Sequence, residues 1–166
     1  MLSARLVRGA TRADLDRIRE IYNEGIEDRE ATLDVEPKSA ASLETWFAEH
    51  DARFEVLVAE EVGLVAGWAS LNRYSYRYAY DGVADLTIYV ARVARGTGVG
   101  TELLTTIEQR ARAHGFHKIV LFTLPFNVAG QSLYRKRGFC EVGVFREQGV
   151  RDGHRIDVMA MEKIIA

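Results

Sequence analysis

The chain has 166 residues, with 22 Lys and Arg against 24 Asp and Glu, and a formal net charge of −2. This length favours one domain, residues 1–166, with a single core, and the balanced charge gives no reason to expect nucleic acid or an anionic membrane as a partner. No apolar run reaches the roughly 18 residues of a membrane span, and the N-terminus has no signal-peptide core, so we expect a cytoplasmic protein.

The first half of the chain predicts a strand, two helices and a hairpin. After a short strand at 4–7, the capping signal Thr11–Asp14 precedes a helix that we expect Gly25 to stop. A polar stretch then leads to a second short helix that contains Leu43, Trp46 and Phe47. Two further strands, 54–59 and 64–71, are predicted to form a hairpin.

The second half alternates strands and helices and ends in an antiparallel pair. The predicted strands are 86–90, 118–124, 142–146 and 155–161, and the predicted helices are 98–114 and 127–137. The order β-α-α-β-β-β-α-β-α-β-β predicts an α/β sandwich with a mixed sheet.

Cysteine and histidine content gives two further expectations. Cys140 is the only cysteine and cannot form an internal disulfide, which suits a reducing compartment, and its place beside Phe139 predicts an inert core residue. The four histidines show no metal-ligand spacing, so we predict no metal site.

The most informative motif is the loop Arg95-Gly-Thr-Gly-Val-Gly-Thr101. It follows an apolar strand and opens a helical segment. Three glycines let an anion approach the backbone, and a helix start leaves about four N–H groups unpaired with partial positive charge. Strand, glycine loop and helix predict a phosphate or pyrophosphate cradle, although the glycines alone also fit a tight β–α turn.

Two common phosphate loops do not match this motif. A P-loop ends in Gly-Lys-Ser/Thr, and no Lys lies near Gly100. A dinucleotide fingerprint needs glycine where this chain has Thr101, and an acidic residue about 20 positions on, where it has Val120. The pattern that does match, Arg-x-x-Gly-x-Gly, resembles the coenzyme A signature of the GCN5-related N-acetyltransferase (GNAT) superfamily.

The segment Asn127-x-x-Gly-x-x-Leu-Tyr-x-Lys-x-Gly-Phe139 agrees independently, because it resembles the second motif of these acetyltransferases, with Gly130 where Ala or Ser is usual. The resemblance implies the acyl-CoA N-acyltransferase fold, a mixed, mostly antiparallel twisted sheet flanked by about four helices, with acetyl-CoA as co-substrate. The cofactor contacts that it implies are Ile88, Tyr89, Val90, Arg95, Gly96, Thr97, Gly98, Val99, Gly100, Thr101 and Asn127.

Further segments resemble the phosphinothricin and arsinothricin N-acetyltransferase branch of this superfamily. They are Tyr22–Glu24, Gly25–Arg29, Ala31-Thr32, Glu36-Pro37, Gly67–Leu71, Ala79-Tyr80, Leu124–Asn127 and Glu141–Glu147. This branch acetylates small amino-acid-like amines and is typically dimeric. The resemblance therefore implies a small-molecule amine as substrate, a homodimer and a role in resistance or detoxification.

Acetyl transfer from a thioester needs a base for the protonated amine and a proton donor for the leaving thiolate. Asp85 is the candidate base, because it starts the cofactor-contacting strand, but an ordinary Asp pKa of about 3.9 makes it a weak base unless burial raises that pKa. Capping of a bulge or pairing with an Arg is the alternative role. Tyr134 is the candidate proton donor, and core packing with Leu133 and Phe139 is its alternative role.

The stretch Asn72–Tyr80 contains four Tyr and two Arg and indicates the acceptor side. Arg77 and Arg73 could clamp a carboxylate or phosphinate in bidentate fashion, and Thr32 and Leu33 could line the same pocket. A dimer contact is the alternative for this stretch. For the whole protein, one alternative is acetylation of protein N-termini or of polyamines, and the two arginines disfavour the polyamines. The other alternative is a non-catalytic acyl-CoA sensor.

Overall fold

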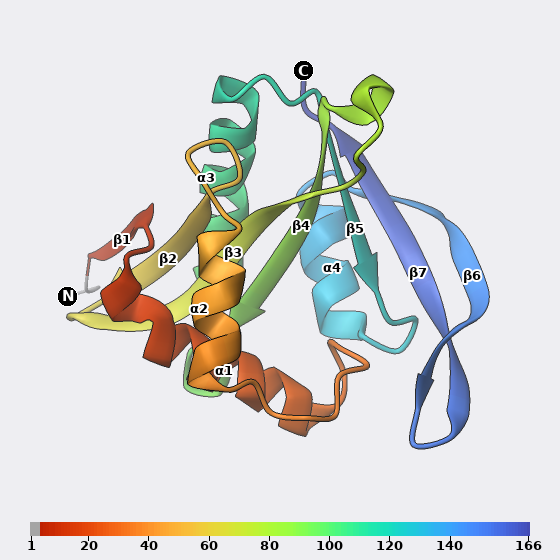
Figure 1. The fold of residues 1–166 in the computed structure, drawn as a ribbon, viewed down its shortest axis with the longest axis horizontal. Helices are drawn as coiled ribbons and strands as arrows, with labels where there is room; N and C mark the ends of the chain where they lie inside the picture. Colours follow the sequence, from red (N-terminus) through yellow and green to blue (C-terminus); the bar gives the residue numbers. More distant parts are fainter. Residues whose placement is uncertain (1–3) are drawn as a thin grey trace.

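The computed structural model describes residues 4–166, which form one twisted sheet with helices on both faces (Figure 1). Within these residues the strands are β1 (Arg5–Gly9), β2 (Val56–Glu61), β3 (Leu64–Arg73), β4 (Val83–Val90), β5 (Lys118–Thr123), β6 (Cys140–Arg151) and β7 (His154–Ile164). The helices are α1 (Leu15–Asp28), α2 (Ala40–Ala48), α3 (Val99–Ala113) and α4 (Val128–Lys136), with short 3-10 helices η1 (Arg12–Asp14), η2 (Tyr78–Tyr80) and η3 (Arg92–Ala94). The predicted order of strands and α-helices is confirmed.

The strand order in the sheet is β1-β2-β3-β4-β5-β7-β6, and only the β4–β5 pair is parallel. That pair is short: it joins Val83, Ala84 and Asp85 to residues 118–120. β4 then continues to Val90 while β5 continues beside β7, so the two strands separate beyond Asp85. The separation opens the sheet at its centre.

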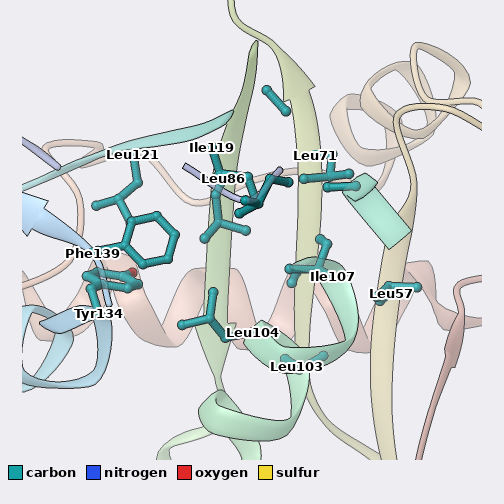
Figure 2. Packing of buried hydrophobic residues seen from close by; sticks show 14 of the residues in the cluster. Leu57, Leu71, Leu86, Leu103, Leu104, Ile107, Ile119, Leu121, Tyr134 and Phe139 are labelled. Atoms are coloured by element: carbon teal, nitrogen blue, oxygen red, sulfur yellow. The ribbon is translucent and has the colours of Figure 1, made fainter. Parts of the chain in front are cut away.

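Both faces of the sheet are buried at β2, as its apolar run illustrates. Leu57 and Ala59 pack in the cluster under α3, together with Leu103 and Ile107 (Figure 2). Their neighbours Val56 and Val58 point to the other face and pack with residues of α1 and α2. Alternation along the strand places successive side chains on opposite faces, so this sheet is the middle layer of three.

Two sequence predictions are wrong for tertiary reasons. Gly25 does not end the first helix, which continues to Asp28 and ends where Arg29 adopts a left-handed φ of 61°. A Cβ at Gly25 would lie 2.7 Å from Cε1 of Tyr89, so the glycine makes room for that ring. Cys140 is exposed and not part of the core, because β6 is an edge strand with mostly exposed side chains.

Two further observations bear on the predicted absences. No helix within residues 4–166 is long and apolar enough to cross a bilayer. In the same residues, His, Cys, Asp and Glu side chains do not gather in any group of three that could hold a metal ion.

Candidate active site

A cavity of about 640 Å³ lies where β4 and β5 separate. It extends from the α3 N-terminus to the loop between α1 and α2. Its lining contains most of the predicted site residues: Thr32, Leu33, Asp85, Ile88, Tyr89, Val90, Arg95, Gly96, Gly98, Val99, Gly100, Thr101, Asn127 and Tyr134. Thr97, Arg73 and Arg77 are the predicted site residues that do not line it.

The glycines of the loop have two different structural roles. Gly96 and Gly98 have φ values of 75° and 93°, in the left-handed region that L side chains rarely adopt. Gly100 lies in the first turn of α3, where a Cβ would be 2.9 Å from Cδ2 of Leu133 in α4. Two glycines therefore shape the loop, and the third lets α3 approach α4, so that the N-terminus of α3 faces the cavity.

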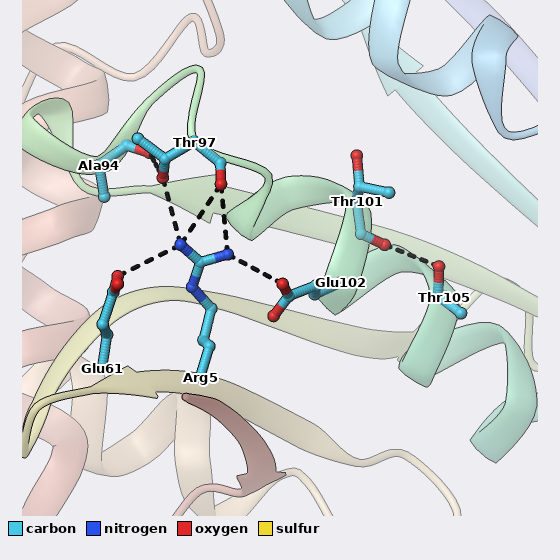
Figure 3. A network of polar contacts seen from close by, with 7 residues as sticks. All are labelled: Arg5, Glu61, Ala94, Thr97, Thr101, Glu102 and Thr105. Carbon is cyan, nitrogen blue, oxygen red and sulfur yellow. Dashed lines mark hydrogen bonds and ion pairs between the residues drawn. The ribbon is translucent and has the colours of Figure 1, made fainter. Parts of the chain in front are cut away.

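Arg5 on β1 anchors this loop from outside the cavity (Figure 3). Its guanidinium donates to the carbonyl oxygen of Thr97 at 3.4 Å and forms ion pairs with Glu61 at 3.2 Å and Glu102 at 3.0 Å. The Thr97 hydroxyl donates to the carbonyl of Ala94 at 2.6 Å. Thr97 thus contacts Arg5 and Ala94, which hold the loop in place, and this explains why it does not line the cavity.

Arg95 lines the cavity but is paired with the C-terminal end of α1. Its Nη1 lies 2.5 Å from Oδ2 of Asp28, and its Nε donates to the carbonyl of Val90 at 3.3 Å. Arg92 and Arg95 hydrogen-bond to the Asp28 carboxylate and lower its pKa. The pair holds the loop against α1 and leaves Arg95 at the cavity edge.

Asp85 is a partly buried carboxyl group on the wall of the cavity. Burial raises its pKa to about 7, and a hydrogen bond from Asn72 partly opposes this shift. The register between β3 and β4 shows no bulge at Asp85, and no Arg contributes to its pKa among the described residues. Neither structural alternative for Asp85 is therefore observed, and its pKa lies where a general base works efficiently near neutral pH.

Asn72, the cross-strand partner of Asp85, holds this part of β4. Its Nδ2 donates to Oγ1 of Thr87 at 3.0 Å and to the carbonyl of Asp85 at 3.3 Å. Its Oδ1 lies 2.9 Å from Nε2 of His50 and 3.1 Å from Oγ of Ser70. β3 and the segment that follows α2 thus fix the position of the strand that carries Asp85.

The edge of β4 beyond Asp85 supplies free main-chain groups. Ala91 donates its N–H to the carbonyl of Ala66 in β3 at 2.8 Å. Since hydrogen-bonding directions alternate along an antiparallel strand, the N–H groups of Val90 and Ile88 point to the opposite edge. That edge faces the gap left by β5, where a bound acyl group could accept from them.

Asn127 and Tyr134 occupy the α4 side of the cavity. Asn127 caps α4, because its Oδ1 accepts from the N–H of Gly130 at 3.1 Å. Tyr134 packs edge-on against Phe139 with ring centroids 6.0 Å apart, and burial raises its pKa above the ordinary value of 10. It therefore combines the packing role with a place on the cavity wall, and it keeps its proton at neutral pH.

The acceptor-side predictions divide between two places. Thr32 and Leu33, in the α1–α2 loop, line the same cavity as Asp85. Arg73 ends β3, where its guanidinium lies over the rings of Phe54 and Tyr76, and Arg77 is exposed just before η2. The structure therefore does not bring the two arginines together with Thr32 and Leu33 in one cavity of this chain.

Several cavity residues were not anticipated from the sequence. They are Gly25, Asp28, Glu30, Ala31, Leu86, Thr87, Ala94, Phe122, Thr123, Leu124, Ala129, Gly130, Ser132, Leu133, Lys136 and Val158. Some of them, such as Ser132 and Lys136, stand inside the recognised helix motif and could have been found by helical spacing. Arg5 carries no local signal, since its partner Thr97 is 92 residues away.

The described geometry combines a glycine loop at a helix N-terminus, a gap in the sheet and a partly buried carboxyl group, and the comparisons agree with it. Residues 15–139 match the model of the acetyltransferase (GNAT) family. The chain belongs to this family and is an N-acetyltransferase. It is 32% identical to the L-methionine sulfoximine/L-methionine sulfone acetyltransferase of Pseudomonas paraeruginosa, over 94% of this chain and 92% of that protein.

Two solved structures share the fold closely. One is a GNAT phosphinothricin acetyltransferase from Sinorhizobium meliloti in complex with acetyl-CoA, with a TM-score of 0.89 and 30% identity over 96% of this chain and 88% of the other. The other is the ribosomal-protein-alanine N-acetyltransferase from Brucella melitensis, with a TM-score of 0.91 and 32% identity over 96% of this chain and 99% of the other.

Proposed function

We propose that this N-acetyltransferase transfers acetyl from acetyl-CoA to the amino group of a small anionic amino-acid-like acceptor, of the arsinothricin, phosphinothricin or methionine sulfoximine type. The observation that carries the proposal is Asp85, a partly buried carboxyl group in the same cavity as the glycine loop, with a pKa raised to about 7. Resistance or detoxification is the role that such acceptors suggest.

The cavity residues fit acetyl-CoA. Gly96 and Gly98 expose main chain at the N-terminus of α3, where a pyrophosphate would be stabilised by unpaired N–H groups. The free edge of β4 at Ile88 and Val90 suits an extended arm with amide groups, and Asn127 stands on the opposite wall. When bound, acetyl-CoA supplies the acetyl group as a thioester.

Asp85 takes up the proton that the acceptor ammonium group must lose before its nitrogen attacks. The short Asp side chain favours transfer through one water molecule. The N–H of Val90, on the free edge of β4, hydrogen-bonds the carbonyl oxygen on which negative charge develops; removing such a donor typically costs about 10²- to 10³-fold in rate. The protonated Tyr134 hydroxyl gives its proton to the departing sulfur.

The similar proteins are named for different acceptors, so the acceptor is the part of the proposal that most needs its own argument. Thr32 and Leu33 line its end of the cavity, and Arg77 and Arg73 are proposed to attract its anionic group. Acetylation of protein N-termini is a second candidate, because the Brucella melitensis structure named for ribosomal-protein-alanine is as similar in fold as the phosphinothricin acetyltransferase.

Release of free CoA across a panel of amines tests the acceptor. The panel contains arsinothricin, phosphinothricin, methionine sulfoximine, ordinary amino acids, spermidine and an N-terminal peptide. We expect strong turnover of the first three and its loss in Arg77→Ala. Turnover confined to the peptide or spermidine would overturn the anionic acceptor, and binding of acetyl-CoA without turnover of any amine would favour a sensor.

A homodimer and a cytoplasmic location complete the proposal. β6 is an edge strand with exposed apolar side chains, including Val142, Val144 and Phe145, which suits an interface between two copies. The single Cys140 suits a reducing compartment. Light scattering on the purified protein tests the dimer, and a Val144→Glu variant is expected to separate the copies.

A further inference from the structure

The loop between α1 and α2 is fastened to the distal end of the β6–β7 hairpin. Arg29 forms an ion pair with Asp152, and Nη1 of Arg151 donates to the carbonyl oxygens of Arg29 at 2.9 Å and Thr32 at 3.1 Å. These contacts hold the main chain of the loop on both sides of Ala31. The loop therefore cannot withdraw from the hairpin without breaking several charge-assisted hydrogen bonds.

Leu33 lies directly against Gly149 at this junction. A Cβ at position 149 would overlap Cδ1 of Leu33, and among residues 4–166 no other residue is within 3.4 Å of it. Gly149 does not have the left-handed φ that would require glycine for the backbone. The side chain of Leu33, and not the backbone conformation of β6, is therefore what a larger residue would disturb.

Leu33 is also part of the cavity wall, together with Thr32 and Asp85. The Leu33 side chain thus lies between β6 on one side and, on the other, the part of the cavity where the acceptor is proposed to bind. Because the main chain of the loop is held by Arg151, a group added at position 149 moves the Leu33 side chain and not the whole loop. Since Leu33 borders the cavity, we expect the displaced side chain to turn toward it.

We propose that Gly149 is a specificity-determining position of the acceptor site, which acts through Leu33. Because glycine has no side chain, Leu33 can pack against β6 and leave more of the cavity open. The residue at position 149 thereby determines the size of the acceptor side chain that the site admits. Gly149 is a positioning residue, since it does not line the cavity itself. The inference rests on the proposed acceptor end of the cavity and names the residue pair that shapes it.

Steady-state kinetics of Gly149→Ala test the inference, with KM measured separately for the amine and for acetyl-CoA. One methylene in an apolar pocket changes specificity by about 10- to 200-fold, so we expect KM for the amine to rise about tenfold, more for larger acceptors than for smaller ones. KM for acetyl-CoA should stay within about twofold, because an added Cβ at position 149 meets Leu33 and not Asp28 or Arg5, which hold the glycine loop.

Gly143→Ala is the matched control. Gly143 lies on the same strand, also lacks a left-handed φ, and a Cβ there would have no neighbour within 4 Å. We expect its kinetics and its melting temperature to equal those of the original chain. The double variant Gly149→Ala with Leu33→Ala removes the overlap and should restore KM for small acceptors, while Leu33→Ala alone should improve turnover of larger ones.

Three results would overturn the inference: an unchanged KM for the amine in Gly149→Ala, an equal rise in both KM values, or no rescue in the double variant. If no amine of the panel is turned over by the original chain, the proposed acceptor fails first. A crystal structure of Gly149→Ala then decides separately whether Leu33 has moved into the cavity, and an unmoved Leu33 rejects the role of Gly149.

Discussion

The two sides of the cavity are built in different ways. On the cofactor side, one continuous segment from β4 through the glycine loop into α3 presents main-chain groups, and side chains such as Arg5 only support it from behind. On the acceptor side, side chains from β4, the α1–α2 loop and the hairpin meet around one partly buried carboxyl group. Main-chain groups can bind the same cofactor in proteins of many different sequences, whereas the choice of acceptor depends on individual side chains.

Substitution of Asp85 should have the largest effect. General-base catalysis contributes about 10²- to 10⁴-fold, so we expect Asp85→Asn to lower kcat by that factor while KM for acetyl-CoA stays near its original value. Isothermal titration with acetyl-CoA checks that the cofactor side is intact. A kcat within threefold of the original would mean that Asp85 is not the base. The acceptor side would then no longer be distinguished from the cofactor side by a catalytic carboxyl group.

The pH dependence of the rate should follow the same carboxyl group. The pKa of Asp85 is raised to about 7, so its deprotonated, proton-accepting form declines about tenfold per pH unit below that value. We expect kcat/KM for the amine to fall about 50-fold from pH 7 to pH 5, with a break near 7 that is absent in Asp85→Asn. A profile identical in the two proteins would contradict the assignment.

The same shift makes a prediction about stability. A carboxyl pKa that is higher in the folded than in the unfolded chain means that the folded state binds more protons, so Asp85 destabilises the fold increasingly as pH rises from about 4 to about 7. Asp85→Asn should therefore raise the melting temperature at pH 8 and change it little at pH 4. An equal change at both pH values would argue against a buried charge.

On the cofactor side, Gly98→Ala should affect acetyl-CoA alone. The φ of 93° is unfavourable for alanine by about 1–2 kcal/mol, so we expect KM for acetyl-CoA to rise about tenfold with KM for the amine nearly unchanged. Gly9→Ala is the control, because that glycine has an ordinary φ and no neighbour within 4 Å of an added Cβ. Equal effects of the two substitutions would show that loop geometry is unimportant.

The smallest effect is expected at Gly130. A Cβ there would lie 2.5 Å from Nδ2 of Asn127, so Gly130→Ala must move the capping side chain. Loss of the cap costs about 1 kcal/mol and the alanine regains a similar amount in helix propensity, which leaves the melting temperature nearly constant. KM for acetyl-CoA should rise two- to threefold; an unchanged value would mean that Asn127 does not contact the cofactor.

The same contrast explains what could be predicted from the sequence. The glycine loop and the α4 segment are local, so Gly98 and Asn127 could be assigned from their spacing. Asp85 could be placed at the start of a strand, but its raised pKa required the surrounding burial. Gly25 was misjudged because the group that needs its space is the ring of Tyr89, which no local pattern reveals.

On the acceptor side, local sequence motifs predicted less, because the contacts there join segments that are far apart in the sequence. The Arg and Tyr residues of segment 72–80 are close in sequence, yet Arg77 does not line the cavity and only Asn72 contacts the main chain of Asp85. The contact of Leu33 with Gly149 joins the α1–α2 loop to β6, two segments that are far apart in the sequence. Such contacts follow from the packing of the hairpin and are not encoded in any short motif.

The separation of β4 from β5 has a further consequence for the behaviour of the protein in a crowded solution. A strand with free N–H and C=O groups is a template for pairing with strands of other chains and so favours aggregation. Here the edge at Ile88 and Val90 lies inside a cavity that is also lined by residues of α3, β5, α4 and the α1–α2 loop. The enzyme thus keeps this strand edge within the fold and not at the outer edge of the sheet, where pairing with another chain would carry a greater risk of aggregation.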